Sequence, residues 1–143
     1  YRRSLERFVM RTSSFMRPVF EAARTSLRRV VFAEGEDERA LRAAQIVVDE
    51  QLARPTLVGR PSVIEHRLRA AGLRIRAGAD FELIDPEDDA RYRDYWEDYL
   101  RLRRREGVTA DIAKSMLRRS STTIASMMVR RGDADAALCG LQG

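Results

Sequence analysis

The chain has 143 residues, of which 44% are hydrophobic and 34% are charged. This composition excludes a disordered tail and a membrane protein, and the length corresponds to one ordinary domain or a large part of one. The formal net charge of +5 does not indicate a nucleic-acid-binding protein, because it comes from residues 1–30, where eight arginines stand against Glu6 and Glu21. Residues 31–143 carry 19 basic and 20 acidic side chains.

Residues 1–27 are predicted to form a helical linker or entry segment. Apolar side chains recur from Leu5 to Phe20 at three- and four-residue steps, which is the period of one helix face. Thr12, Ser13 and Ser14 are possible cap residues, so the segment is either one helix or two. The pattern favours an amphipathic helix with a solvated basic face, and a linker helix that docks onto another domain is the alternative.

From residue 28 onward, strands and helices are predicted to alternate. Short apolar runs predict buried strands at 29–33, 55–58, 81–84 and 134–139. Amphipathic patterns predict helices over 38–51, 61–72, about 90–106, 109–118 and 120–131. Because parallel neighbours need a crossover connection, this order predicts an α/β fold with a mainly parallel sheet between two helix layers, a three-layer α/β/α arrangement.

In open sheets of this kind, ligands bind at the carboxyl ends of the strands, which here are residues 34–37, 59–60, 85–86 and 139–140. The acidic loop 34–38 lacks the glycine pattern of phosphate-binding loops, and its four carboxylates would repel an anion. Helix capping and the helix dipole explain acidic residues at this position. A role facing a cleft remains the alternative.

The helix predicted at 90–106 carries Tyr92, Tyr95, Trp96 and Tyr99 before a cluster of four arginines between Arg101 and Arg105. Aromatic residues next to arginines can bind single-stranded nucleic acid. However, residues 80–98 hold nine acidic residues against two arginines, and Trp96, Tyr99 and Leu100 have core spacing. A small anionic group is a better ligand for the arginine cluster than a polyanion.

The chain has one cysteine and one histidine, Cys139 and His66. This excludes a disulfide framework, a Cys-based zinc site and a His-His metal motif, and a reducing cytoplasm is the expected location. Cys139 is expected to be a buried structural thiol. Met116, Met127 and Met128 are expected to fill the core.

Several stretches together resemble the phosphotransacetylase-like domain, a phosphate acetyl/butyryl transferase domain, at the C-terminal end of large bacterial NADP-dependent malic enzymes. The resemblance runs in order through nearly the whole chain. It is carried by residues 15–24 (FMRPVFEAAR), 29–39 (RVVFAEGEDER), 53–61 (ARPTLVGRP), 77–83 (AGADFEL), 95–96 (YW), 107–109 (GVT) and 131–136 (RGDADA).

The resemblance implies that residues 28–143 are the first lobe of a two-lobed domain, truncated before the second lobe. It also implies a parent enzyme that converts malate to pyruvate and CO2 with NADP and Mg²⁺ or Mn²⁺, in domains outside this chain. No catalytic residue and no metal ligand of the family falls on a matching position here. Acetyl-CoA or a related acyl-CoA is the implied effector, and the implied assembly is a homo-oligomer in contact with other domains of the same protein.

One binding residue follows from the resemblance. In the transferases, an arginine before a Gly-Val-Thr sequence helps to bind CoA, and Arg103 is the best match here. The leading expectation is therefore a regulatory acyl-CoA-binding domain, with neither nucleic acid nor membrane as a partner. An active lobe that transfers acetyl between CoA and phosphate, and a structural oligomerisation domain, are the alternatives.

Overall fold

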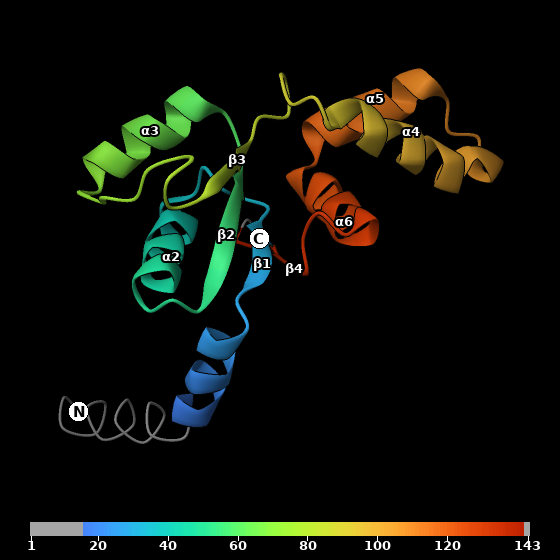
Figure 1. The fold of residues 1–143 in the computed structure, drawn as a ribbon. Helices are drawn as coiled ribbons and strands as arrows, with labels where there is room; N and C mark the ends of the chain where they lie inside the picture. The colour runs from blue at the N-terminus through green and yellow to red at the C-terminus, as the bar shows by residue number, and fades with distance from the viewer. Residues whose placement is uncertain (1–15, 142–143) are drawn as a thin grey trace, which may run out of the picture.

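The computed structural model describes residues 16–141 (Figure 1). Residues 16–25 are helical, so the predicted entry helix is confirmed over this part. The predicted cap residues Thr12, Ser13 and Ser14 lie outside the described residues. No helix within 16–141 has both the length and the apolar character needed to cross a membrane.

The sheet has four parallel strands, β1 (Arg28–Phe32), β2 (Ala53–Val58), β3 (Glu82–Ile84) and β4 (Ala136–Leu138). Their spatial order is β3-β2-β1-β4, and Phe32 pairs with Leu57 on one side and with Leu138 on the other. The chain therefore proceeds outward from β1 to β3 and then returns across β1 to form β4. The strand order reverses between β1 and β4, and such a point is where α/β sheets commonly bind ligands.

Helices cover both faces of this sheet, as Figure 1 shows. One side carries α2 (Glu38–Asp49) and α3 (Pro61–Ala70), and the other carries α6 (Ser121–Arg131). The pair α4 (Tyr92–Arg103) and α5 (Ala110–Arg119) packs beyond α6, and a short 3₁₀ turn, η1 (Arg104–Glu106), extends α4. The predicted three-layer α/β/α architecture is confirmed.

Two apolar cores result from the alternation of side chains along the strands. Phe32 and Leu57 lie in the core beneath α2 and α3, together with Leu41 of α2. Val31 and Val58 pack on the opposite face. That second core includes Tyr95, Leu117, Ile124, Met127 and Met128.

Polar caps and glycines set the helix ends close to where the sequence predicts them. Asp37, Thr109 and Ser120 each accept a hydrogen bond from a backbone amide in the first turn of α2, α5 and α6. Gly107 and Gly132 end their helical segments with φ values of 83° and 81°, a left-handed conformation that favours glycine.

Two expectations about burial, for Cys139 and Met116, were wrong. Cys139 is exposed, because β4 ends at Leu138 and borders no further strand among the described residues. Met116 is 40% exposed, whereas Met127 and Met128 are buried as expected. On α4, Tyr95 is the buried aromatic residue, whereas Trp96 and Tyr99 are partly buried and pack against the core as their spacing indicates.

Candidate ligand-binding cavity

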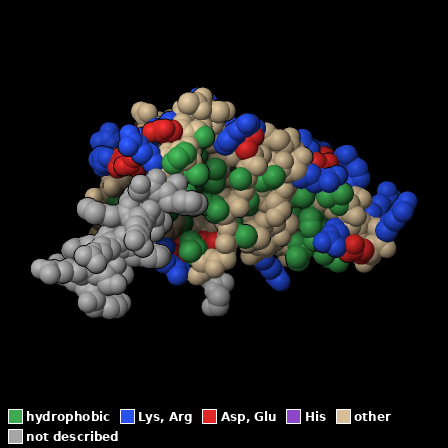
Figure 2. Space-filling model, turned by 90° about the horizontal axis from the view of Figure 1, so that it is seen from below, with side chains coloured by type: hydrophobic (Ala, Val, Ile, Leu, Met, Phe, Trp, Pro, Cys, Tyr) green, Lys and Arg blue, Asp and Glu red, His purple; other side chains and the backbone are tan. Residues whose placement is uncertain are grey.

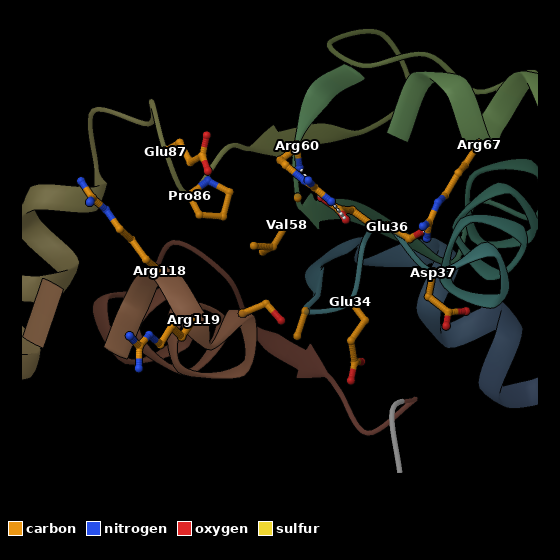
Figure 3. A pocket seen from close by; sticks show the side chains of 13 residues that line it. Glu34, Glu36, Asp37, Val58, Arg60, Arg67, Pro86, Glu87, Arg118 and Arg119 are labelled. Carbon is orange, nitrogen blue, oxygen red and sulfur yellow. Dashed lines mark hydrogen bonds and ion pairs between the residues drawn. The ribbon is translucent and has the colours of Figure 1, made fainter. Parts of the chain in front are cut away.

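A cavity of about 400 Å³ opens at the carboxyl ends of β1, β2 and β3 (Figure 3). Its position agrees with the edge at which the sequence predicts ligand binding. One wall comes from the loops after β1 and β2, and the other comes from the junction of α5 and α6. The lining residues are Ala33, Glu34, Glu36, Asp37, Val58, Gly59, Arg60, Arg67, Pro86, Glu87, Arg118, Arg119 and Ser121.

Gly35 brings the loop after β1 close to the end of β2. A Cβ at this position would lie 2.7 Å from the Val58 carbonyl oxygen and 2.8 Å from its nitrogen. The Gly35 amide donates a hydrogen bond to that carbonyl oxygen at 3.1 Å. Because only glycine allows this approach without a shift of backbone, it determines where Glu34 and Glu36 emerge.

Glu36 links the two loops of this wall. Its Oε1 accepts hydrogen bonds from the backbone amide and the Nε of Arg60 at 2.9 and 2.8 Å, and its Oε2 accepts one from Arg60 Nη2 at 2.9 Å. Arg67 donates to the Glu36 carbonyl oxygen. The side-chain hydrogen bonds from Arg60 are the main cause that lowers the pKa of Glu36.

Glu34 reaches across the strand-order reversal to the segment after β4. Its Oε1 accepts hydrogen bonds from the backbone amides of Gly140 and Leu141, both at 3.1 Å. Arg39 Nη2 donates to the Leu141 carbonyl oxygen at 2.6 Å. Glu34 of the loop after β1 and Arg39 of α2 therefore hold the chain where it leaves β4.

Asp37 satisfies the capping interpretation of the acidic loop. Its Oδ1 accepts from the Arg39 amide at 2.8 Å, and the Arg39 guanidinium lowers the pKa of Asp37 through a side-chain hydrogen bond. Glu34, Glu36 and Asp37 all line the cavity, so Asp37 caps α2 and faces the cavity at the same time. The two alternatives that the sequence left open are therefore not exclusive.

The opposite wall carries Arg118 and Arg119 at the end of α5 and Ser121 at the start of α6. Figure 3 shows the two arginines on the far side of the cavity from Glu34 and Asp37. The Arg118 guanidinium lies over the Tyr92 ring, 5.7 Å from its centroid. The sequence analysis did not predict these arginines as site residues. Two adjacent arginines directly before the capping residue Ser120 were the pattern that could have indicated them.

Arg103, the binding residue suggested by the sequence, lies in the last turn of α4 and is exposed. Its Nη1 donates to both carboxylate oxygens of Glu106, at 3.0 and 2.7 Å. Arg101 pairs with Asp98 at 3.3 Å. The arginine cluster at 101–105 does not line the cavity described above. Within residues 16–141, no three His, Cys, Asp or Glu side chains gather as a metal ion would require.

Several known proteins are similar to this chain in sequence. Residues 14–143 match the family model described as phosphate acetyl/butaryl transferase. The chain is 51% identical over its whole length to a NAD-dependent malic enzyme of Rhizobium meliloti, and 46% identical over its whole length to a NADP-dependent malic enzyme of Haemophilus influenzae. It spans about a fifth of these relatives, 19% of each.

The fold is also similar to that of a solved structure. A phosphotransacetylase from Streptococcus pyogenes superimposes with a TM-score of 0.75 at 28% identity, over 90% of this chain and 39% of the other. The resemblance inferred from the sequence to phosphotransacetylase-like domains of malic enzymes is therefore confirmed.

Proposed function

This chain belongs to the phosphate acetyl/butaryl transferase family, and from that premise we propose that it is a regulatory acyl-CoA-binding lobe of a malic enzyme. The observation that carries the proposal is the 51% identity to a malic enzyme along the whole chain. Oxidative decarboxylation of malate to pyruvate and CO2, with NADP and a divalent metal ion, then belongs to other parts of that enzyme. Acetyl-CoA is the proposed effector.

The chemistry of the cavity favours binding over catalysis. Among its described lining residues, Ser121 supplies a hydroxyl group, and no histidine lies with it as a base. Glu36 and Asp37 both have a lowered pKa because arginines hydrogen-bond to their carboxylates. Such carboxylates stay ionised near neutral pH and make poor general acids.

Arg103 is the proposed contact for a phosphate of the acyl-CoA. Its exposed position leaves it accessible to a large ligand, and its bond to Glu106 holds the guanidinium in one orientation. A phosphate would compete with the Glu106 carboxylate for the same donors, and it offers the guanidinium equivalent bidentate geometry.

Inhibition of malate oxidation by acetyl-CoA in the full-length enzyme tests this proposal. Arg103→Ala should raise the concentration for half-inhibition by about tenfold, the usual effect of losing a hydrogen bond to a charged group. Arg93→Ala is the matched control, because Arg93 also lies exposed on α4 in an ion pair, with Glu97 at 2.8 Å. Equal effects of the two substitutions would remove Arg103 from the site, and a wild-type enzyme indifferent to acetyl-CoA would refute the regulatory role.

An active transferase lobe is the second candidate function. The structural match to a Streptococcus pyogenes phosphotransacetylase favours it. Formation of acetyl phosphate from acetyl-CoA and inorganic phosphate by the full-length protein distinguishes this function from regulation. Turnover would support the transferase, and acetyl-CoA binding without turnover would support the regulatory domain.

A structural oligomerisation domain is the third candidate. Apolar side chains remain exposed on the outer helices, with Leu102 of α4 at 45% and Ile112 of α5 at 47% exposure. Figure 2 shows hydrophobic side chains interspersed with arginines on the side of the molecule that holds α4, α5 and α6. Exposed apolar side chains of this kind occur at interfaces between proteins. Sedimentation of the full-length protein with Ile112→Glu tests whether this surface joins subunits, and an unchanged oligomer would exclude it.

A further inference from the structure

Three of the four carboxylates that line the cavity have hydrogen-bond partners within the chain. Glu34 accepts from the two amides after β4, and Glu36 and Asp37 accept from Arg60 and Arg39. The fourth carboxylate, Glu87, forms no ion pair within residues 16–141, and it adds only a smaller attraction to the Glu36 hydrogen bond that raises the pKa of Arg60. Three of the four negative charges are therefore already engaged by donors of the chain itself.

Arg118 and Arg119 differ from the other two arginines of the cavity. Arg60 pairs with Glu36, and Arg67 donates to the carbonyl oxygen of the same residue. Within residues 16–141, neither Arg118 nor Arg119 lies within ion-pair distance of a carboxylate. Two neighbouring positive charges at the edge of a concave site therefore lack an anionic partner among the described side chains.

The helix that follows the two arginines adds to the positive potential. The Ser120 side chain caps α6 through the Thr123 amide at 3.2 Å. The first turn of a helix leaves its other amides without an intrahelical acceptor, here those of Ser121 and Thr122. These amides and the positive end of the helix dipole favour an anion at this end of an eleven-residue helix.

The other place where an anion could bind is already filled. In sheets with this strand order, the backbone amides at the order reversal often hold a ligand's phosphate. Here the Gly140 and Leu141 amides donate to Glu34 instead. An anionic ligand would have to displace a carboxylate of the chain itself at that point, whereas the wall of Arg118 and Arg119 offers no such competition.

We propose that Arg118, Arg119 and Ser121 form an anion-binding subsite for a phosphoryl group. Two guanidinium groups can each engage phosphate oxygens through paired N–H donors, and the Ser121 hydroxyl and amide supply further donors. The volume of about 400 Å³ accommodates a diphosphate or one end of a larger ligand. This inference deepens the proposed function and rests on it for the natural ligand, since an acyl-CoA carries phosphates; free phosphate or diphosphate is the other source of the same chemistry.

The test uses the full-length protein and two probes, inorganic pyrophosphate and acetyl-CoA, in titration calorimetry at constant ionic strength. Each variant is compared with wild type, because pyrophosphate bound at a dinucleotide site elsewhere in the protein does not depend on Arg118 or Arg119. The variant Arg118→Gln/Arg119→Gln removes the proposed donors. The matched control Arg54→Gln/Arg130→Gln removes the same charge from two exposed arginines that line none of the described cavities.

We expect the first double variant to weaken binding of at least one probe tenfold or more, and the control to change it less than threefold. Arg118→Lys/Arg119→Lys should fall between wild type and the glutamine variant, because lysine keeps the charge but loses the paired donors. Weakened binding of acetyl-CoA supports the subsite and the proposed function together. Loss of pyrophosphate binding in a protein that does not bind acetyl-CoA supports the subsite and refutes the proposed function.

Two results would overturn the inference. If the glutamine variant binds both probes as tightly as wild type does, the subsite is wrong, while binding of acetyl-CoA still leaves the proposed function standing. If wild type binds neither probe, the subsite is wrong as well. Circular dichroism of each variant confirms that the substitutions leave the fold intact, as expected for exposed arginines at the end of a helix.

Discussion

Glu36 and Arg60 join the loops after β1 and β2 through three hydrogen bonds of 2.8 to 2.9 Å. One of them comes from the Arg60 backbone amide, so the interaction positions main chain as well as side chains. The amide belongs to the residue that directly precedes α3. The wall of the cavity and the start of that helix are thereby held by one carboxylate.

This interaction predicts a dependence of stability on pH. Because the pKa of Glu36 is lower in the folded chain than its ordinary value of 4.5, the stabilisation is present above that value and is lost as the pH falls below it. Glu36→Gln should lower the free energy of unfolding at pH 7, and its deficit relative to wild type should shrink as the pH approaches 3. Urea unfolding followed by Trp96 fluorescence measures both. Glu65→Gln, which removes an exposed carboxylate from α3, is the control, and a deficit that is the same at both pH values would contradict the prediction.

Glu34 is predicted to order the segment that follows β4. Glu34→Ala removes the acceptor for the Gly140 and Leu141 amides, so both should exchange hydrogen faster. Glu34→Gln keeps one oxygen acceptor and should retain part of the protection. Hydrogen–deuterium exchange resolved to residues 138–141 provides the measurement. Equal exchange in all three proteins would show that the contact does not order this segment.

Gly35 is predicted to tolerate no side chain. In Gly35→Ala the new Cβ would meet the backbone of Val58, and overpacking of this kind costs about 1–3 kcal/mol. Gly59→Ala is an informative comparison, because its Cβ would meet side-chain atoms of Glu36 and Ile64, which can move. Thermal unfolding should therefore show a larger decrease in Tm for Gly35→Ala. A larger decrease for Gly59→Ala would mean that the backbone approach at Gly35 is not restrictive.

Tyr95 is predicted to stabilise the second core through its hydroxyl group as well as its ring. The side chain is 1% exposed, and its hydroxyl donates to Asp133 Oδ2 at 2.9 Å. Tyr95→Phe keeps the packing but leaves this acceptor unpaired, which should cost about 1 kcal/mol. Tyr99→Phe is the control, since Tyr99 is only partly buried. Urea unfolding compares the two, and an equal loss in both variants would argue against a specific role for the Tyr95–Asp133 bond.

Burial also raises the pKa of the Tyr95 hydroxyl, so this group favours the folded chain until the pH rises above the ordinary value of 10. The free energy of unfolding of wild type should therefore fall more steeply above pH 10 than that of Tyr95→Phe. The same urea series, extended to pH 11, measures the difference. Parallel curves would contradict it.

Local patterns predicted the secondary structure well, because the signals for helices and strands lie close together in the chain. Val30, Val31 and Phe32 form part of a predicted strand that the structure extends by a residue at one end and shortens by one at the other. Thr109 and Ser120 begin the helices that their cap chemistry predicts. The segment at 134–139 shortens to Ala136–Leu138, since pairing with β1 covers only these residues.

Burial on the outer helices was less predictable. Helical periodicity alone does not show which way a helix turns toward the sheet, so Tyr95 was missed while Trp96 was expected inside. The same reason explains Met116, which lies on the outer face of α5 although its neighbour Leu117 is fully buried. Local patterns identify no partner for Asp133 or Asp135, which pair with Tyr95 and Arg29 across 38 and 106 residues.

The α/β class, the net positive charge of residues 1–30 and the resemblance to phosphotransacetylase-like domains could be inferred from the sequence alone. These depend on composition, short-range periodicity and ordered motifs, which need no knowledge of distant contacts. The pairing of β4 beside β1, the hydrogen bonds from the amides after β4 to Glu34, and the position of Arg118 and Arg119 on the cavity wall opposite Glu34 follow only from the tertiary structure. Those relationships join residues far apart in the chain, and their geometry arises only when both layers of helices pack on the sheet.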